Sequence, residues 1–97
     1  MLIRTEWDEQ KAASNLVKHG VSFEVAALAF ADPLALSVQD RLENGERRWQ
    51  TLGMAGEHML LLVAHSVDED EDGEERIGII SARKADKKDR KRHEQNR

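Results

Sequence analysis

The order of patterns along the sequence predicts an α+β fold: a short strand, two helices, a three- to four-stranded antiparallel sheet and a C-terminal helix. Apolar residues recur at helical spacing in the first third of the chain. Alternating or continuous apolar runs, separated by turn residues, follow in the middle. With 97 residues, 39% of them hydrophobic, the chain can bury one modest core, so we expect a single domain over residues 1–97.

The N-terminal region is predicted to contain a strand over Leu2–Thr5 and a helix over Glu9–His19. Asp8 can act as the N-cap of this helix, and Gly20 can end it in the left-handed conformation. The apolar residues at helical spacing, which would form its buried face, are Ala12, Ala13, Leu16 and Val17.

A second helix and the sheet are expected next. Ser22 can cap the helix, and Asp32-Pro33 would end it. The predicted apolar face of this helix consists of Phe23, Ala26, Ala27 and Phe30. Asn44-Gly45 is a strong hairpin signal, and Gly56 marks another turn. The expected strands are Leu34–Val38, Arg48–Met54, Met59–His65 and Arg76–Ser81.

Charge is distributed unevenly along the last third of the chain. Residues 68–75 contain seven carboxylates and are predicted to form an exposed acidic loop. Residues 83–97 contain eight Lys or Arg against three acids. We expect a charged helix over Ala85–Glu94 and frayed ends at residues 95–97. This asymmetry hints at a polyanionic partner, although two solvated charge runs would account for it equally well.

The composition excludes several classes of protein. The absence of cysteine rules out disulfides, a thiolate nucleophile and a thiolate metal site. The longest apolar run, Met59–Ala64, is far shorter than the ~20 residues of a membrane-spanning helix. The first residues mix charge with short apolar stretches, so we do not expect them to be a signal peptide. We therefore expect a soluble cytoplasmic protein that does not interact with membranes.

No phosphate-binding glycine loop, zinc-protease motif or nucleophile elbow is present. The four histidines are far apart in the sequence, so we expect no metal ion and no other cofactor. The remaining candidates for chemistry are imidazole and basic groups, which can move protons and bind phosphates. Each candidate also has a structural explanation. His19 could offset a helix dipole, Arg48 could form a surface ion pair, and His65 could be a core histidine.

Together, these residues resemble the BrnT family of toxins from bacterial type II toxin–antitoxin systems. The opening signature consists of Trp7-Asp8, Lys11-Ala12, Asn15, Lys18–Phe23, Ala26, Phe30 and Asp32-Pro33. The later pieces, in order, are Gly45-Glu46, Arg48-Trp49, Leu52-Gly53, His65, Arg76-Ile77, Ile79–Ala85, Asp89-Arg90 and His93-Glu94. The resemblance covers about residues 5–94. Two features depart from the family pattern: the acidic stretch is unusually long, and His93 stands where a tyrosine is usual.

The resemblance implies a fold related to RelE-type ribonucleases and a metal-independent endoribonuclease that inhibits translation. It also implies a BrnA-like antitoxin with a ribbon-helix-helix domain, a 2:2 complex, and contact with DNA only through that antitoxin. The residues that we expect to carry catalysis are Lys18, His19, Arg48, His65, Arg76, Arg83 and His93. Those expected to bind RNA are Arg47, Lys84, Lys87, Lys88, Arg90 and Lys91.

Two further expectations can be checked against the structure. His65 and Arg83 should lie on one face of the sheet, because only then could they share a phosphate with Lys18 and His19. The acidic stretch should point away from the site, because it would repel RNA. A non-enzymatic module that binds nucleic acid or protein through the basic face is the alternative to a ribonuclease.

Overall fold

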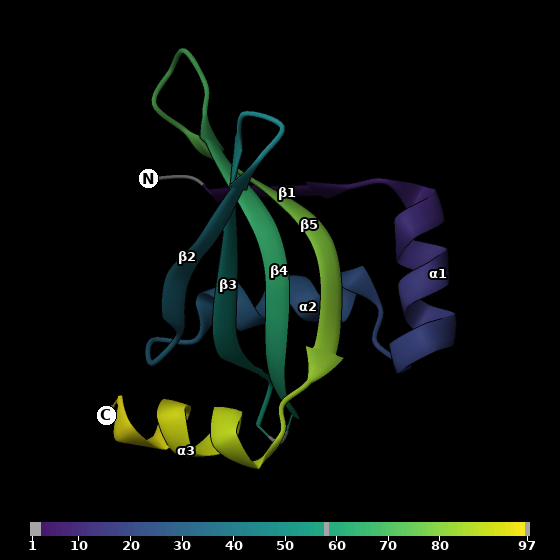
Figure 1. Cartoon of the computed structure of the whole chain (residues 1–97), viewed down its shortest axis with the longest axis vertical. Helices are drawn as coiled ribbons and strands as arrows, with labels where there is room; N and C mark the ends of the chain where they lie inside the picture. The colour runs from purple at the N-terminus through teal and green to yellow at the C-terminus, as the bar shows by residue number, and fades with distance from the viewer. Residues whose placement is uncertain (1–2, 58, 97) are drawn as a thin grey trace.

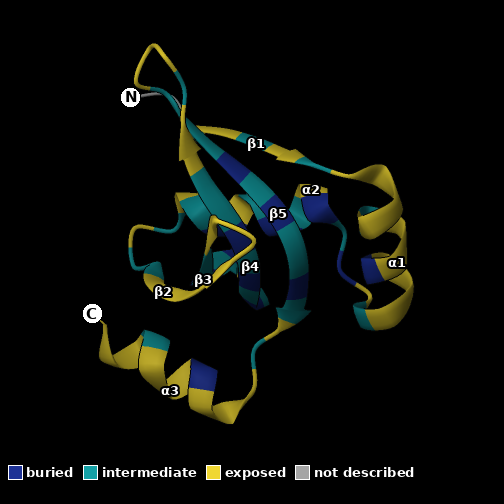
Figure 2. Ribbon diagram, turned by 45° about the horizontal axis from the view of Figure 1, so that its top comes forward, coloured by how far each residue is buried: buried dark blue, intermediate teal, exposed yellow. Residues whose placement is uncertain are grey.

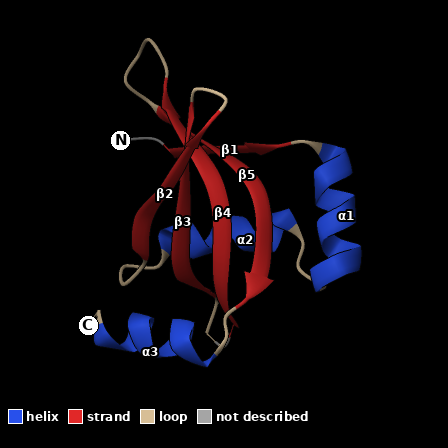
Figure 3. Cartoon of the chain, in the orientation of Figure 1, coloured by secondary structure: helices blue, strands red, loops and turns tan. Residues whose placement is uncertain are grey.

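The computed structural model describes residues 3–57 and 59–96. Its helices are α1 (Glu9–His19), α2 (Phe23–Ala27), the 3-10 helix η1 (Leu28–Ala31) and α3 (Lys87–Gln95). Its strands are β1 (Ile3–Trp7), β2 (Leu36–Glu43), β3 (Glu46–Ala55), β4 (Met59–Glu69) and β5 (Glu75–Lys84). Figure 3 shows the helices in blue around one sheet in red, with α3 at the end of the chain.

The strands form one sheet in the order β1-β5-β4-β3-β2. β1 runs parallel to β5, and the other neighbours are antiparallel. The predicted α+β class is confirmed. The sheet has five strands because the predicted N-terminal strand joins its edge; Leu2, the first residue of that prediction, lies outside the described residues.

The sheet has two different faces. α2 passes behind the strands in Figure 1 and, with η1, covers one face, which we call the helix-covered face. Side chains of Trp49, Thr51 and Val63 belong to it by strand alternation and cross-strand pairing. The opposite face, which we call the open face, carries Gln50 and Ala64. α3 crosses below the lower end of the sheet (Figure 1) and contacts β3.

The core lies between α2, η1 and the sheet. Phe23 is fully buried and packs edge-on against Trp7, with ring centroids 6.0 Å apart. The core residues that meet there include Val21, Ala26, Ala29, Leu61, Val63, Ile77, Ile79 and Ala82. Gly53 lets η1 approach the sheet, because a Cβ at this position would lie 2.4 Å from the carbonyl oxygen of Ala29. Figure 2 shows that burial is concentrated in the central strands and α2.

α1 has the predicted length but presents a different face to the protein. Asp8 caps it by accepting hydrogen bonds from two backbone N–H groups, and Gly20 ends it with φ 71°. The predicted buried residues Leu16 and Val17 are exposed, Val17 by 89%. Asn15 is buried instead, because its amide bonds both the N–H and the C=O of one residue of β5.

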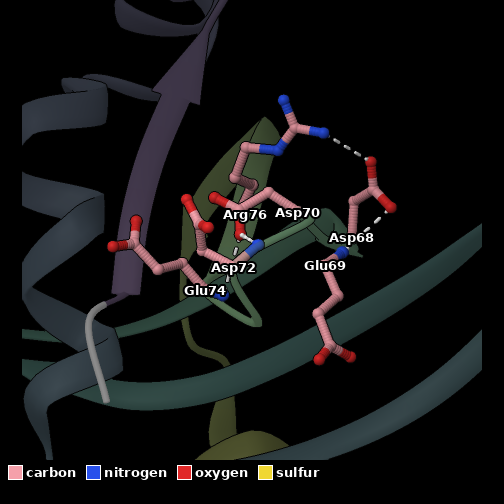
Figure 4. Close-up of polar contacts among 6 residues, drawn as sticks. All are labelled: Asp68, Glu69, Asp70, Asp72, Glu74 and Arg76. Carbon is pink, nitrogen blue, oxygen red and sulfur yellow. Dashed lines mark hydrogen bonds and ion pairs between the residues drawn. The ribbon is translucent and has the colours of Figure 1, made fainter.

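The acidic stretch forms strand ends as well as a loop. β4 continues to Glu69 and β5 begins at Glu75, so the loop is shorter than predicted because backbone pairing extends into the stretch. Asp70 organises the turn by accepting hydrogen bonds from the N–H groups of Asp72 and Glu74, as Figure 4 shows. The loop lies at the end of the sheet opposite α3 (Figure 1).

α3 is held by polar contacts. Asp86 caps it within a capping box completed by Asp89. No residue from Lys87 to Gln95 is apolar. Asn96 donates a hydrogen bond to the carbonyl of Leu34, and Gln95 belongs to the helix, so these two residues are held in place where the sequence predicts fraying. Arg97 lies outside the described residues.

Candidate functional site

Three adjoining hollows form a groove along the open face, beside α1. The largest, about 480 Å³, lies between α1 and β5 and shares Lys11 and Ile80 with a second of about 250 Å³. It shares His19 and Ser81 with a third of about 200 Å³. We call these three hollows together the open-face groove. Its basic and imidazole lining residues are Lys11, Lys18, His19, Arg48 and Arg83.

α1 brings Lys18 and His19 to the groove. Both lie in its last turn, where positive charge is favoured by the helix dipole. Asn15 fixes this end of the helix, because its side chain donates to the carbonyls of Val21 and Ala82 and accepts from the Ala82 N–H, at 2.9–3.0 Å. The backbone positions of Lys18 and His19 relative to β5 are therefore fixed.

Arg48 enters the groove from β3. Its guanidinium Nε lies 3.2 Å from Glu46 Oε1, an ion pair without hydrogen-bond geometry, so the buried Nε has no hydrogen bond among the described residues. The Arg48 side chain is 23% exposed, whereas Glu46 is 53% exposed. Arg48 is thus more enclosed than a side chain in an ordinary surface pair, and it lines the hollow that Lys11 and Ser66 also line.

Arg83 enters from β5, opposite Leu62 of β4, and lines the same hollow as His19 and Gln50. Its Nη1 donates to Asp89 Oδ2 at 2.9 Å and to the carbonyl of Lys84 at 3.2 Å. Burial alone would raise the pKa of Asp89. Hydrogen bonds from the Asp86 N–H and Arg83, with the Arg83 charge, outweigh it and hold the pKa below its ordinary value.

His65 lies on the helix-covered face, so the prediction that it shares a face with Arg83 is wrong. It is 2% exposed and packs edge-on against Phe30, with ring centroids 4.8 Å apart. Its Nδ1 lies 3.2 Å from the carbonyl of Ser66, which can only accept, so the neutral ring carries its proton there. Nε2 then accepts from the hydroxyl of Thr51 at 2.7 Å. Burial lowers the pKa of His65, although the Ser66 carbonyl opposes this.

A β-bulge in β5 explains why His65 and Arg83 lie on opposite faces of the sheet. His65 pairs with Ile79, but the preceding residue, Ala64, pairs with Ser81. Ile80 is therefore an extra residue in β5. With an unbroken register, Arg83 would oppose Leu61 on the helix-covered face, together with His65; the bulge instead places it opposite Leu62.

Two other predicted catalytic residues are also outside the groove. His93 Nε2 lies 2.7 Å from Asp32 Oδ2, and both side chains are nearly buried, so His93 anchors α3 to the segment after η1. Burial would raise the pKa of Asp32, but backbone hydrogen bonds from Met54 and Leu34 and the contact with His93 lower it overall. Arg76 forms an ion pair with Asp68 at 3.0 Å beside the acidic loop (Figure 4).

The residues predicted to bind RNA fall into two groups. Lys84, Lys87, Lys88, Arg90 and Lys91 are exposed at the end of β5 and along α3. Lys84 pairs with Leu61, so strand alternation turns it towards the helix-covered face. Arg47 lines a hollow with Glu46, Asp68, Glu69 and Glu75, so acidic groups surround it. The four residues of α3 extend the positive charge from Arg83, which pairs with Asp89 of this helix, whereas Lys84 and Arg47 do not.

Several groove residues were not predicted from the sequence, among them Lys11, Gln50, Ser66 and Ser81. Lys11 could have been found, because it lies seven residues before Lys18, on the same face of a helix. The other three are ordinary polar residues at alternating strand positions, and no sequence signal separates them from solvated side chains.

The groove residues are suited to phosphate binding and proton transfer. In residues 3–57 and 59–96, no group of three or more His, Asp or Glu side chains is close enough to hold a metal ion; His58 lies outside these ranges. Within the same ranges, no helix has the length and apolar character that crossing a membrane requires.

Comparisons with known proteins show the family and the fold of the chain. The family described as "Ribonuclease toxin, BrnT, of type II toxin-antitoxin system" matches residues 7–89. The crystal structure of the Brucella abortus ribonuclease toxin BrnT is similar in fold, with a TM-score of 0.67, 24% sequence identity and coverage of 89% of this chain and 100% of that chain. No curated protein matches the sequence. The match over most of its length shows that the chain belongs to the BrnT family, the ribonuclease toxins of type II toxin–antitoxin systems.

Proposed function

We propose that this toxin is a cytoplasmic endoribonuclease that inhibits translation. It cleaves RNA in the open-face groove and needs no metal ion. The observation that carries the proposal is the convergence of Lys18, His19, Arg48 and Arg83 on adjoining hollows of one face. These side chains come from α1, β3 and β5, so only the folded chain brings them together.

Metal-free RNA cleavage uses the ribose 2′-hydroxyl as an internal nucleophile. The enzyme must remove the proton of this hydroxyl, stabilise the negative charge on the pentavalent phosphate, and protonate the leaving 5′-oxygen. Arg48 and Arg83 enter the groove from different strands, opposite Ser66 and Leu62 of β4, so they can bind successive phosphates of one RNA strand. Lys11 and Lys18 add positive charge along the α1 side.

His19 is assigned the proton transfer. Among the histidines that the structure describes, it alone lines the groove. Its two possible roles have opposite signatures. If His19 is the base, the cleavage rate rises with pH as the imidazole loses its proton; if it is the acid, the rate falls.

The test is cleavage of a defined RNA by purified protein, with and without EDTA. We expect cleavage to persist with EDTA, and His19→Gln to lower the rate about 100-fold or more, the usual contribution of a general acid or base. Val17→Gln is the matched control, because Val17 is exposed on the same helix and lines none of the three hollows. Abolition by EDTA would contradict the metal-free mechanism.

The same experiment distinguishes the alternative function. A protein that binds RNA through the basic surface but leaves it intact would be a non-enzymatic module. In that case His19→Gln would change neither the RNA product pattern nor toxicity on induction, while substitutions of the basic residues would weaken binding.

A toxin of a type II system acts with a cognate antitoxin, which we propose is BrnA-like and carries a ribbon-helix-helix domain. The surface around the groove and α3 is rich in positive charge, so an acidic segment of the antitoxin can cover it and exclude RNA. We expect a 2:2 complex that contacts DNA through the antitoxin. Mass measurement of the purified complex tests this stoichiometry, and a 1:1 complex would show it to be wrong.

A further inference from the structure

We infer that Asp89 is a positioning residue, which holds Arg83 in the open-face groove and so makes cleavage depend on α3 being in place. The inference rests on the proposed function and adds to it a residue outside the groove. Asp89 belongs to the first turn of α3 and lines none of the three hollows, so it would act only through Arg83.

The Asp89 carboxylate accepts two hydrogen bonds at the start of α3. Its Oδ2 accepts from Arg83 Nη1 at 2.9 Å and from the Asp86 N–H at 3.0 Å. The Asp89 N–H in turn donates to Asp86 Oδ1 at 2.9 Å, which completes the capping box. The capping box at the start of α3 therefore positions the Asp89 carboxylate, and this carboxylate positions Nη1 of Arg83.

The two partners of this pair also differ in exposure. The Asp89 side chain is 8% exposed, whereas that of Arg83 is 40% exposed. An ordinary surface pair has two mobile partners, as in Arg41–Glu43 on β2, where both are substantially exposed. Here the acid is held and the guanidinium remains accessible. Both hydrogen bonds that Arg83 makes to described residues use Nη1, so its other nitrogens can receive a phosphate.

α3 itself is attached to the rest of the protein by polar contacts. It has no apolar side chain, and its contacts at the other end are the His93–Asp32 pair and the Asn96 hydrogen bond to the Leu34 carbonyl. Without these contacts the helix could move, and Asp89 would move with it. The orientation of Arg83 is then linked to the docking of a helix that lies outside the groove.

The experiment compares Asp89→Ala with Asp86→Ser in cleavage and in equilibrium binding of the same RNA. Asp86→Ser removes the same charge from the same helix turn and keeps a capping residue, but Asp86 does not contact Arg83 through its side chain. We expect Asp89→Ala to lower kcat about 10- to 100-fold, because small misplacements of a reacting group have effects of this size. We expect RNA binding to be unchanged or tighter, since a negative charge near the groove is removed. Asp86→Ser should cleave RNA like the wild type.

Arg83→Gln and the double variant complete the test. If Asp89 acts through Arg83, adding Asp89→Ala to Arg83→Gln lowers kcat no further. Independent, multiplicative effects would overturn the inference, as would a folded Asp89→Ala protein with normal kcat. A parallel loss of binding and cleavage with a lowered melting temperature would also overturn it, because it would indicate a purely structural role. If Arg83→Gln itself cleaves normally, or the wild type does not cleave RNA, the proposed function fails as well.

Discussion

The two ends of the open face carry similar arginine–carboxylate pairs in opposite surroundings. At the acidic end, formed by residues 68–75, Arg76 pairs with Asp68, whose side chain is 69% exposed. At the basic end, formed by the last turn of α1, the end of β5 and α3, Arg83 pairs with Asp89, which is nearly buried. We therefore expect the environment of the carboxylate, rather than the presence of an arginine, to decide which end holds a phosphate.

The charge around each pair strengthens this contrast. The acidic end has exposed carboxylates on a loop that extends beyond the sheet (Figure 1). The basic end is surrounded by exposed lysines and arginines of α3. A polyanion is therefore repelled at one end of the face and attracted at the other, which favours one placement of an RNA strand along the groove.

The largest expected effect is the difference in RNA cleavage between a substitution of Arg48 and a substitution of Arg76. Both arginines have an acidic partner and a buried Nε without a hydrogen bond, but only Arg48 lines the groove. We expect Arg48→Gln to lower kcat/KM for RNA cleavage about 100-fold, the effect typical of losing one donor to a developing oxyanion. Arg76→Gln should stay within a few-fold of the wild type. Equal losses in the two variants would remove the distinction between the ends.

A substitution on the helix-covered face should lower the free energy of unfolding without changing the rate of RNA cleavage. Thr51→Val leaves Nε2 of buried His65 without its donor, so we expect the free energy of unfolding to fall by about 1–3 kcal/mol. Urea titrations measure this change. Cleavage by the remaining folded protein should be normal; a direct loss of kcat would show that this face contributes to the chemistry after all.

The pKa of His65 gives the stability a defined pH dependence. Because burial lowers this pKa in the folded state below the ordinary value of 6.5, the unfolded chain takes up the proton first as the pH falls. The contribution of His65 to the free energy of unfolding should thus decrease as the pH drops below about 6.5. In His65→Gln this contribution should be absent, and an unchanged pH profile would contradict the neutral, buried assignment.

Substitution of the exposed lysines of α3 should have a smaller effect, which we expect in the affinity for RNA. Replacing Lys87, Lys88 and Lys91 with Gln removes positive charge beside the groove. We expect affinity for single-stranded RNA to fall about 10-fold at low salt. The slope of log affinity against log salt should become shallower by ~0.7 for each phosphate that the variant no longer neutralises. Binding measured at several salt concentrations tests this, and an unchanged slope would exclude α3 from the RNA interface.

The smallest effect should come from neutralising the acidic loop. Glu71→Gln with Asp72→Asn removes two exposed charges at the end of the sheet far from α3. We expect RNA affinity to rise about two- to three-fold at low salt and the gain to vanish near physiological salt, because charges separated by more than a Debye length of roughly 8 Å are screened there. A large gain that persists at high salt would indicate that the loop lies in the RNA path.

Local signals in the sequence predicted most of the elements. The bounds of α1 follow from Asp8 and Gly20, and the β2–β3 hairpin from Asn44-Gly45, where both residues have positive φ. The buried face of α1 could not be predicted in this way. Hydropathy favoured Leu16, whereas the structure buries Asn15, whose hydrogen bonds reach a strand 67 residues later in the chain.

The candidate site was predictable in its residue types and less so in its geometry. Lys18, His19, Arg48 and Arg83 line hollows on one face. His65 does not, because one unpaired residue in β5 changed the face on which Arg83 emerges. A bulge of this kind depends on contacts between strands and leaves no local mark in the sequence.

The bulge at Ile80 also makes the face on which Arg83 lies depend on the number of residues in β5. Upstream of it, Ile77 and Ile79 contribute to the core; downstream, Ala82 does so, and Arg83 points the other way. Deleting Ile80 alone would leave an unbroken alternation, in which Ala82 still opposes Val63 and Arg83 still opposes Leu62. Deleting Ser81 as well would exchange the inner and outer positions of everything that follows, pushing a guanidinium into the core and an alanine into solvent. This part of β5 can therefore lose its bulged residue but not one of its paired residues, even where the identities of its side chains are free to vary.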